Sequence, residues 1–256
     1  MHPTISRFRG GSLAAFALAA LLVGGAAAPS AAAYTYPHRH PSVISYVALG
    51  DSYAAGQAVD CSHPRTSYPR LLDRLRRITL VGNATCAGAT SMDVATTQRS
   101  ALNRRVRLVT ITVGANDLGL SALPVACSSN PNAPACLAAI GQAETALPIL
   151  APHLAAAYVA VAKASPRARI LVTGYAPLLS TGPINAATRL LNATIRGVVR
   201  MVARSGVHIR YVGVQFRHHT LDSRAPWFFV SGVNAFHPNA AGERAYARAI
   251  LARLRR

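Results

Sequence analysis

The sequence predicts an α/β protein, built as a three-layer α/β/α sandwich around a parallel sheet. First, five short apolar runs are typical of buried strands. Second, longer segments with apolar residues at three- and four-residue spacing alternate with most of these runs, which favours helices packed on both faces of the sheet. Third, neither a linker nor a repeat divides the chain, so we expect one domain. The expected strands are 46–49, 78–81, 108–113, 170–173 and 209–214, and the expected helices 68–77, 138–164, 186–204 and 238–254.

The first 33 residues precede this pattern and resemble a secretory signal peptide. Arg7 and Arg9 form a basic start, residues 13–28 are an apolar run, and small residues follow up to Ala33. We expect cleavage after Ala33, a secreted product, and a single catalytic domain at 34–256. A membrane anchor is the alternative, but the run is short and rich in Ala and Gly compared with the about 20 apolar residues that a span needs.

Each later element follows from its local pattern. The strand at 46–49 ends in Gly50, where the chain can turn sharply. The helix at 186–204 carries an apolar stripe opposite its arginines, and no later segment looks long and apolar enough to span a membrane. The closing helix at 238–254 has Pro238 near its start, where a missing N–H is harmless. The apolar stripe of the helix at 186–204 consists of Leu190, Leu191, Ile195, Val198, Val199 and Val202.

The chain is strongly basic, with 27 Lys and Arg against 8 Asp and Glu and a net charge of +19. Loss of residues 1–33 would remove two arginines and leave +17. Such a charge predicts attraction to anionic envelope polymers or acidic lipids, although a merely solvated basic face is an equal alternative. The arginines are scattered rather than grouped with aromatic residues, so we expect no specific nucleic-acid partner.

Four cysteines follow the leader: Cys61, Cys86, Cys127 and Cys136. An even number in an exported chain predicts two disulfides, for which three pairings exist. Residues 127–136 read as a compact loop that a bond between its end cysteines would pin. A metal site is not expected, because no pair has the close C-x-x-C spacing of zinc ligands.

Four polar clusters fall where ligands bind such sheets, beyond the carboxyl ends of the strands. They are "GDS" (50–52), "NATCAGAT" (83–90), "GAND" (114–117) and "NAFHPN" (234–239). A serine needs a base within reach and donors for the oxyanion that its attack creates. His237 is the candidate base for Ser52, and the N–H of Ser52, the N–H of Gly88 and the side chain of Asn116 are the candidate donors.

Each of these residues also has an ordinary interpretation. Ser52 fits a helix N-cap, Asn116 and Gly88 fit turns, and a histidine such as His237 is often structural. Only their order along the chain and their shared place at the strand ends are specific.

Taken together, the four clusters resemble the blocks of the SGNH, or GDSL, hydrolase family. The resemblance covers residues 47 to 254 and implies a flavodoxin-like, five-stranded parallel sheet and ester hydrolysis through an acyl-enzyme, without a cofactor. It implies Ser52 as nucleophile, His237 as base, and Ser52, Gly88 and Asn116 as the oxyanion hole. The cysteine placement resembles secreted lipases and esterases of high-GC bacteria, which favours the pairs Cys61–Cys86 and Cys127–Cys136.

One position departs from the family pattern. The family has an acid three residues before the histidine, and Asn234 stands there. We expect the main chain or side chain of Asn234 to orient His237, with Asp222 as the reserve candidate; a surface Asp222 paired with a neighbouring arginine is its ordinary interpretation. Asp51 and Asp117 are expected to order loops by accepting backbone N–H bonds.

Two further groups have open roles. Trp227, Phe228 and Phe229 are expected to line an acyl pocket, form a lipid-facing lip, or join the core. His218 and His219, and the pair His38 and His40, invite a metal interpretation, but without paired carboxylates or cysteines we expect no metal.

The sequence therefore predicts a secreted, monomeric serine esterase or lipase acting on a lipid or small-molecule ester. One alternative is a deacetylase of cell-wall or plant polysaccharide. Another is a cationic envelope-binding protein whose hydrolase site has decayed, which the charge and Asn234 motivate.

Overall fold

The computed structural model describes residues 43–120, 126–127 and 130–255, so the expected signal peptide lies outside the described residues. Its centre is a five-stranded, fully parallel sheet in the order β2-β1-β3-β4-β5. This is the flavodoxin-like order, and it confirms the predicted fold class. The strands are β1 (Ile44–Gly50), β2 (Ile78–Asn83), β3 (Leu108–Thr112), β4 (Arg169–Thr173) and β5 (Ile209–Val212).

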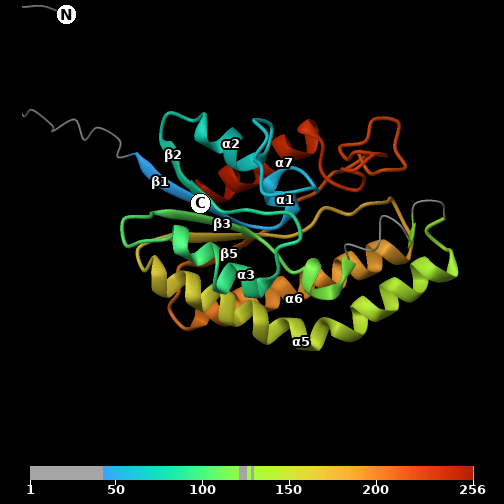
Figure 1. Ribbon diagram of the computed structural model, residues 1–256, viewed down its shortest axis with the longest axis horizontal. Helices are drawn as coiled ribbons and strands as arrows, with labels where there is room; N and C mark the ends of the chain where they lie inside the picture. Colours follow the sequence, from blue (N-terminus) through green and yellow to red (C-terminus); the bar gives the residue numbers. More distant parts are fainter. Residues whose placement is uncertain (1–42, 121–125, 128–129, 256) are drawn as a thin grey trace, which may run out of the picture. The chain divides into compact units, whose positions relative to one another are not determined.

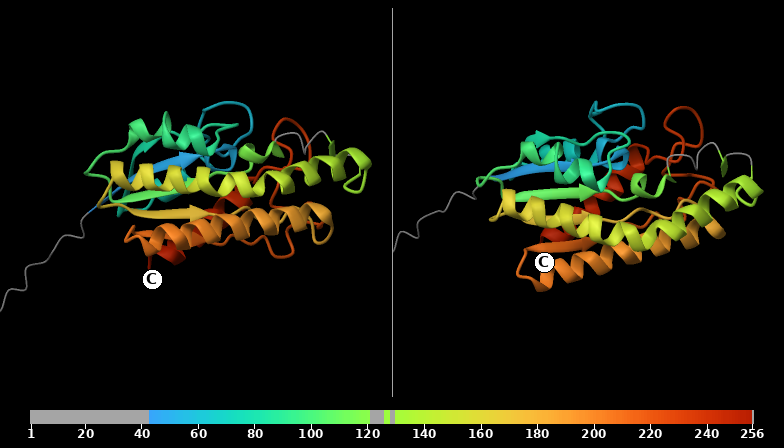
Figure 2. Two further views of the ribbon diagram at one scale, coloured as in Figure 1. Left: turned by 90° about the horizontal axis from the view of Figure 1, so that it is seen from below. Right: turned by 60° about the horizontal axis from the view of Figure 1, so that its bottom comes forward.

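Helices cover both faces of this sheet (Figures 1 and 2). One face carries α1 (Ser52–Ala55), α2 (Tyr68–Asp73) and α7 (Ala240–Leu254). The other carries α3 (Ser91–Ala95), α5 (Pro134–Ala164) and α6 (Pro183–Arg204), and Figure 2 shows α5 and α6 running side by side. Among the described residues, short 3₁₀ turns also form at η1 (Gln98–Ala101) and η2 (Asn116–Leu118).

Strand β1 shows why the expected strands read as unbroken apolar runs. Tyr46 and Ala48 point into the core beneath α2 and α7, whereas Val47 and Leu49 point into the core beneath α3, α5 and α6. All four side chains are fully buried. A parallel strand with both faces covered has no solvent side and therefore no polar alternation.

Several helix ends differ from the expected ones. Helix α2, expected over 68–77, ends at Asp73. Helix α7, expected from 238, begins at Ala240, because Asn239 caps it by accepting the N–H groups of Ala241 and Gly242. Helices α5 and α6 begin earlier than expected, each with a proline in its first turn.

Helix α5 corrects two expectations. Because it begins at Pro134, Cys136 lies in its first turn and residues 127–136 are not a loop throughout. By length and composition alone it could also span a membrane, which the sequence analysis did not foresee. In this fold it packs one side on the sheet through Leu150, Leu154 and Tyr158, as a core helix of a globular protein does.

Candidate active site

The nucleophile candidate lies on a sharp turn between β1 and α1. Gly50 has φ +126°, and a Cβ there would stand 2.1 Å from the carbonyl oxygen of Thr112. Only glycine fits this close approach. Asp51 is the N-cap of α1 and Ser52 its first helical residue. The alternative interpretation of Ser52 as an N-cap is therefore wrong, and its hydroxyl is free for another partner.

Gln98 supports this turn from the side, a role that the sequence analysis missed. Its buried side chain accepts the N–H of Gly50 at 2.7 Å and donates to the carbonyl of Gly50 at 2.9 Å. This amide therefore pairs the N–H of Gly50, which would otherwise be a costly unpaired donor, and adds a second donor to a carbonyl that also accepts the N–H of Cys86.

His237 reaches Ser52 across 185 positions of sequence. Its Nε2 lies 2.8 Å from the Oγ of Ser52, and its Nδ1 lies 3.0 Å from the carbonyl oxygen of Ala235. A carbonyl can only accept, so we assign the proton of the neutral ring to Nδ1. This leaves Nε2 with a lone pair directed at the serine hydroxyl, the arrangement that a general base needs.

Burial governs the electrostatics of this base. Burial lowers the pKa of His237, while the carbonyls of Ala235 and Asn234 raise it in part by favouring the charged ring. The ring is therefore neutral, and able to accept a proton, at neutral pH.

The expected side-chain role of Asn234 is wrong. Its Oδ1 accepts the N–H of Ala58 at 2.8 Å, so the side chain is turned toward the loop after α1. A main-chain carbonyl does orient the imidazole: Nδ1 bonds the carbonyl of Ala235, and the carbonyl of Asn234 also favours the charged ring. The reserve candidate Asp222 is exposed and accepts bonds from the N–H, at 3.1 Å, and the hydroxyl of Ser180.

The three candidate oxyanion donors line one cavity together with Ser52 Oγ and His237. In the described part of the chain, the N–H groups of Ser52 and Gly88 donate to no protein acceptor. Gly88 has φ +78° and open space where a side chain would stand. The side chain of Asn116 donates one amide N–H to the carbonyl of Ala89 at 2.9 Å, and this bond fixes its orientation. The second amide N–H remains available for a ligand.

Two aspartates hold the loops of this site. Asp51 accepts the N–H of Tyr53 at 3.0 Å and the hydroxyl of Tyr175, and Asp117 accepts the N–H and hydroxyl of Ser91. Burial raises the pKa of Asp51 to about 7, against the lowering effect of its two hydrogen bonds. Neither carboxylate bonds His237, in keeping with a loop-ordering role.

Tyr175 is another residue that the sequence analysis missed. Besides donating to Asp51, its hydroxyl accepts the N–H of Ala115 at 3.2 Å. It therefore ties the loop of the nucleophile to the loop that carries Asn116. No local sequence pattern marks it.

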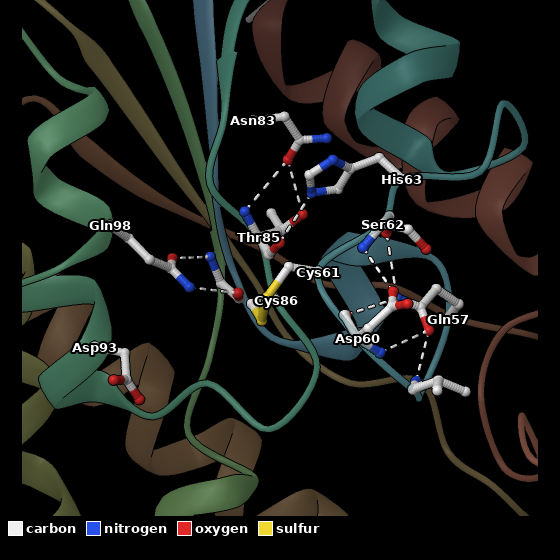
Figure 3. The surroundings of a disulfide bond; sticks show 12 residues. Gln57, Asp60, Cys61, Ser62, His63, Asn83, Thr85, Cys86, Asp93 and Gln98 are labelled. Atoms are coloured by element: carbon white, nitrogen blue, oxygen red, sulfur yellow. Dashed lines mark hydrogen bonds between the residues drawn. A yellow bond between two sulfur atoms is a disulfide. The ribbon is translucent and has the colours of Figure 1, made fainter.

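A disulfide joins two of the loops around the cavity (Figure 3). Cys61 is bonded to Cys86, between the segment after α1 and the segment that carries Gly88. Backbone bonds reinforce the link, from the N–H of Cys86 to Gly50 and from the N–H of Ala87 to Asp60, each at 3.0 Å. The second disulfide, Cys127–Cys136, attaches residue 127 to the first turn of α5.

The cavity has a volume of about 470 Å³ and mostly apolar walls. An acyl pocket was one of three alternatives for the aromatic segment, and the cavity lining does not include Trp227, Phe228 or Phe229. Phe228 is buried against Phe216, Trp227 stacks on His219, and Phe229 is partly exposed. The apolar lining comes instead from Val59, Leu120, Ala176, Leu178, Leu191, Val233 and Phe236.

Comparison with known proteins gives consistent matches. The profile of the GDSL-like Lipase/Acylhydrolase family matches residues 48–245. A lipase of Streptomyces rimosus is 31% identical over an alignment of 223 positions, and the match covers 77% of this chain and 82% of that one. Lipase 1 of Streptomyces coelicolor is 28% identical over an alignment of 251 positions, and the match covers 88% of this chain and 92% of that one.

Solved structures agree with these matches. The extracellular lipase of Streptomyces rimosus has a TM-score of 0.75 at 28% identity, and phospholipase A1 of Streptomyces albidoflavus NA297 has 0.73 at 27%. Each comparison covers 82% of this chain and 99% of the other. An acetylxylan esterase of Geobacillus stearothermophilus, at 15% identity and a TM-score of 0.54, shares the fold alone.

Proposed function

The chain belongs to the GDSL-like lipase/acylhydrolase family and is a serine ester hydrolase, and from this premise we propose that Ser52 and His237 form its catalytic dyad. The observation that carries the proposal is the 2.8 Å contact between Nε2 and Oγ at the wall of the cavity that three N–H donors also line. Nucleophile, base and oxyanion donors are the parts that acyl transfer needs.

In the acylation step, Ser52 Oγ attacks the ester carbonyl carbon as Nε2 of His237 takes its proton. The carbonyl oxygen becomes an oxyanion, which the N–H groups of Ser52 and Gly88 and the amide of Asn116 stabilise. The tetrahedral intermediate then collapses: the bond to the alcohol oxygen breaks, and the imidazolium of His237 gives its proton to that alcohol. An acyl-enzyme on Ser52 remains.

Water completes the cycle. His237 takes a proton from a water molecule that attacks the acyl-enzyme, the same donors hold the second oxyanion, and the proton returns to Ser52 Oγ as the carboxylic acid leaves. The imidazolium forms twice in each cycle. In place of a carboxylate, the Ala235 carbonyl stabilises it through the Nδ1–H bond.

We propose a carboxylic ester with an apolar acyl chain as the substrate. The apolar walls of the cavity support this class, because a sugar would need polar partners there. The relatives named lipase and phospholipase A1 support it as well.

Secretion and attraction to anionic surfaces complete the proposal. Two disulfides in the described structure and the extracellular relative support export with removal of residues 1–33. The net charge of +19 supports adsorption to acidic lipid or envelope polymers. N-terminal sequencing of the exported protein and salt-dependent binding to anionic vesicles test these two points.

The proposed dyad is tested by Ser52→Ala on a chain-length series of p-nitrophenyl esters, with labelling by a fluorophosphonate. We expect kcat to fall by more than about a thousandfold and labelling to vanish. Ser100→Ala, which changes an exposed serine, is the matched control and should behave as the parent. Normal turnover by Ser52→Ala would sink the proposal, and an unlabelled, inactive parent would favour a decayed site.

A further inference from the structure

The residue directly before the base has an unfavourable backbone conformation. Phe236 has φ +67°, in the left-handed region that residues other than glycine and asparagine rarely adopt. For a bulky side chain this conformation costs free energy and persists only where surrounding contacts impose it. Something in the site must therefore hold the main chain of Phe236.

One such contact comes from the residue next to the nucleophile. The hydroxyl of Tyr53 donates to the carbonyl oxygen of Phe236 at 2.8 Å, across 183 positions of sequence. The ring of Tyr53 packs edge-on against Tyr175, at 5.1 Å between centroids, and against Tyr246, and it lies 5.3 Å from the ring of His237. Burial raises the pKa of Tyr53, so its hydroxyl stays protonated and remains a donor throughout the working pH range.

The conformation of this segment also sets the direction of the base. The carbonyl that bonds Nδ1 belongs to Ala235, the residue before Phe236, and the imidazole belongs to the residue after it. In a triad, a carboxylate side chain would orient the ring through its own charged hydrogen bond. Here a rotation at Phe236 would move the Ala235 carbonyl and the imidazole relative to each other.

We propose that Tyr53 is a positioning residue for His237, whose hydroxyl holds the strained main chain of Phe236 and so keeps the imidazole aligned with Ser52. This inference rests on the proposed catalytic dyad. Tyr53 thereby supplies, through the backbone, part of the orientation that the absent acid supplies elsewhere.

Tyr53→Phe tests the proposal, because it removes only the hydroxyl and keeps the ring that lines the cavity. We expect kcat for a soluble p-nitrophenyl ester to fall about tenfold and KM to stay within about twofold, since the acyl-binding walls are unchanged. Tyr158→Phe is the matched control. Tyr158 is fully buried, and its hydroxyl has no hydrogen-bond partner among the described residues, so its loss should leave both constants unchanged.

A second comparison separates positioning from a general loss of stability. Glycine adopts φ +67° without strain, so in a Phe236→Gly background the hydroxyl should matter little. We expect Tyr53→Phe to lower kcat less than about threefold in that background. A tenfold loss in both backgrounds would overturn the positioning role, as would a fall in kcat that only tracks the unfolded fraction in a thermal melt.

The outcomes also distinguish this proposal from the catalytic one. Should Ser52→Ala be inactive while Tyr53→Phe matches the parent in kcat, only the positioning role of Tyr53 falls. Should Ser52→Ala keep normal activity, the catalytic dyad itself falls, and Tyr53 loses the role with it.

Discussion

Replacement of Asn116 by alanine is a sharp test of the proposed oxyanion hole. The side chain has two N–H groups, and one is held by the carbonyl of Ala89 at 2.9 Å. That bond leaves the amide little rotational freedom, so the second N–H is already directed when the oxyanion forms. Alanine removes both.

The expected magnitude has two separable parts. Loss of one oxyanion donor lowers kcat by about 100- to 1000-fold, or about 3 to 4 kcal/mol of transition-state stabilisation. Loss of the bond to Ala89 lowers the free energy of unfolding by about 1 kcal/mol. KM should change little, because the donor acts mainly on charge that develops after binding. Asn116→Asp should be at least as inactive, since a carboxylate cannot donate and repels the oxyanion.

Steady-state kinetics on a soluble p-nitrophenyl ester, with urea unfolding of the same preparations, measures both parts. Asn103→Ala is the matched control, because Asn103 is exposed and its side chain likewise makes a hydrogen bond to the main chain, in this case by accepting the N–H of Arg105 at its Oδ1. It should lose a similar stability and no activity. A folded Asn116→Ala variant with kcat within fivefold of the parent would refute the assignment of Asn116.

Three further predictions concern pH and backbone space. Because burial lowers the pKa of His237, the acid limb of kcat/KM should have its midpoint below pH 6.5; a midpoint above 6.5 contradicts this. Glu243 is buried, and one of its oxygens has no hydrogen-bond partner within residues 43–120, 126–127 and 130–255. Burial raises the pKa of Glu243, so its contribution to stability is complete below the unfolded pKa and is lost as pH rises through the folded pKa. Between pH 5 and pH 9, the free energy of unfolding should fall by at least about 1 kcal/mol less in Glu243→Gln than in the parent. Urea unfolding at both pH values measures this difference. Gly50→Ala should lose more than about 3 kcal/mol or fail to fold, because its Cβ would stand 2.1 Å from the Thr112 carbonyl, whereas Gly141→Ala, in an open helical position, should gain about 0.5 to 1 kcal/mol in thermal melts.

The sheet was predictable because its signal is local. A strand buried on both faces must be apolar throughout, so β1 and β3 stand out in the sequence without knowledge of their neighbours. Helix ends were less predictable, because they depend on single caps. Asn239 sets the N-terminus of the closing helix by accepting two backbone N–H groups. An asparagine in a sequence has many other roles, so this cap could not be recognised beforehand.

The meeting of Ser52 and His237 was predictable only from a family pattern, as was the choice of Cys61–Cys86. The support of the site was not predictable in either way. Gln98 bonds Gly50 from 48 positions away and Tyr53 bonds Phe236 from 183. Nothing in the sequence around Gln98 or Tyr53 indicates that its side chain bonds the main chain of a distant residue. Asn234 shows the same limit, because the sequence left both its main chain and its side chain open as the group that orients His237, and only the folded loop shows its Oδ1 accepting the N–H of Ala58.

The large sequence separation between Ser52 and His237 has a consequence for biosynthesis. A ribosome makes the strand with the serine first and must add 185 more positions before the histidine exists. A growing polypeptide therefore has the hydroxyl of Ser52 but lacks the imidazole of His237, and the proposed dyad predicts that a fragment ending before residue 234 is inert toward esters. Under the proposed dyad, the order of synthesis therefore delays esterase activity until the closing segment of the chain has been made.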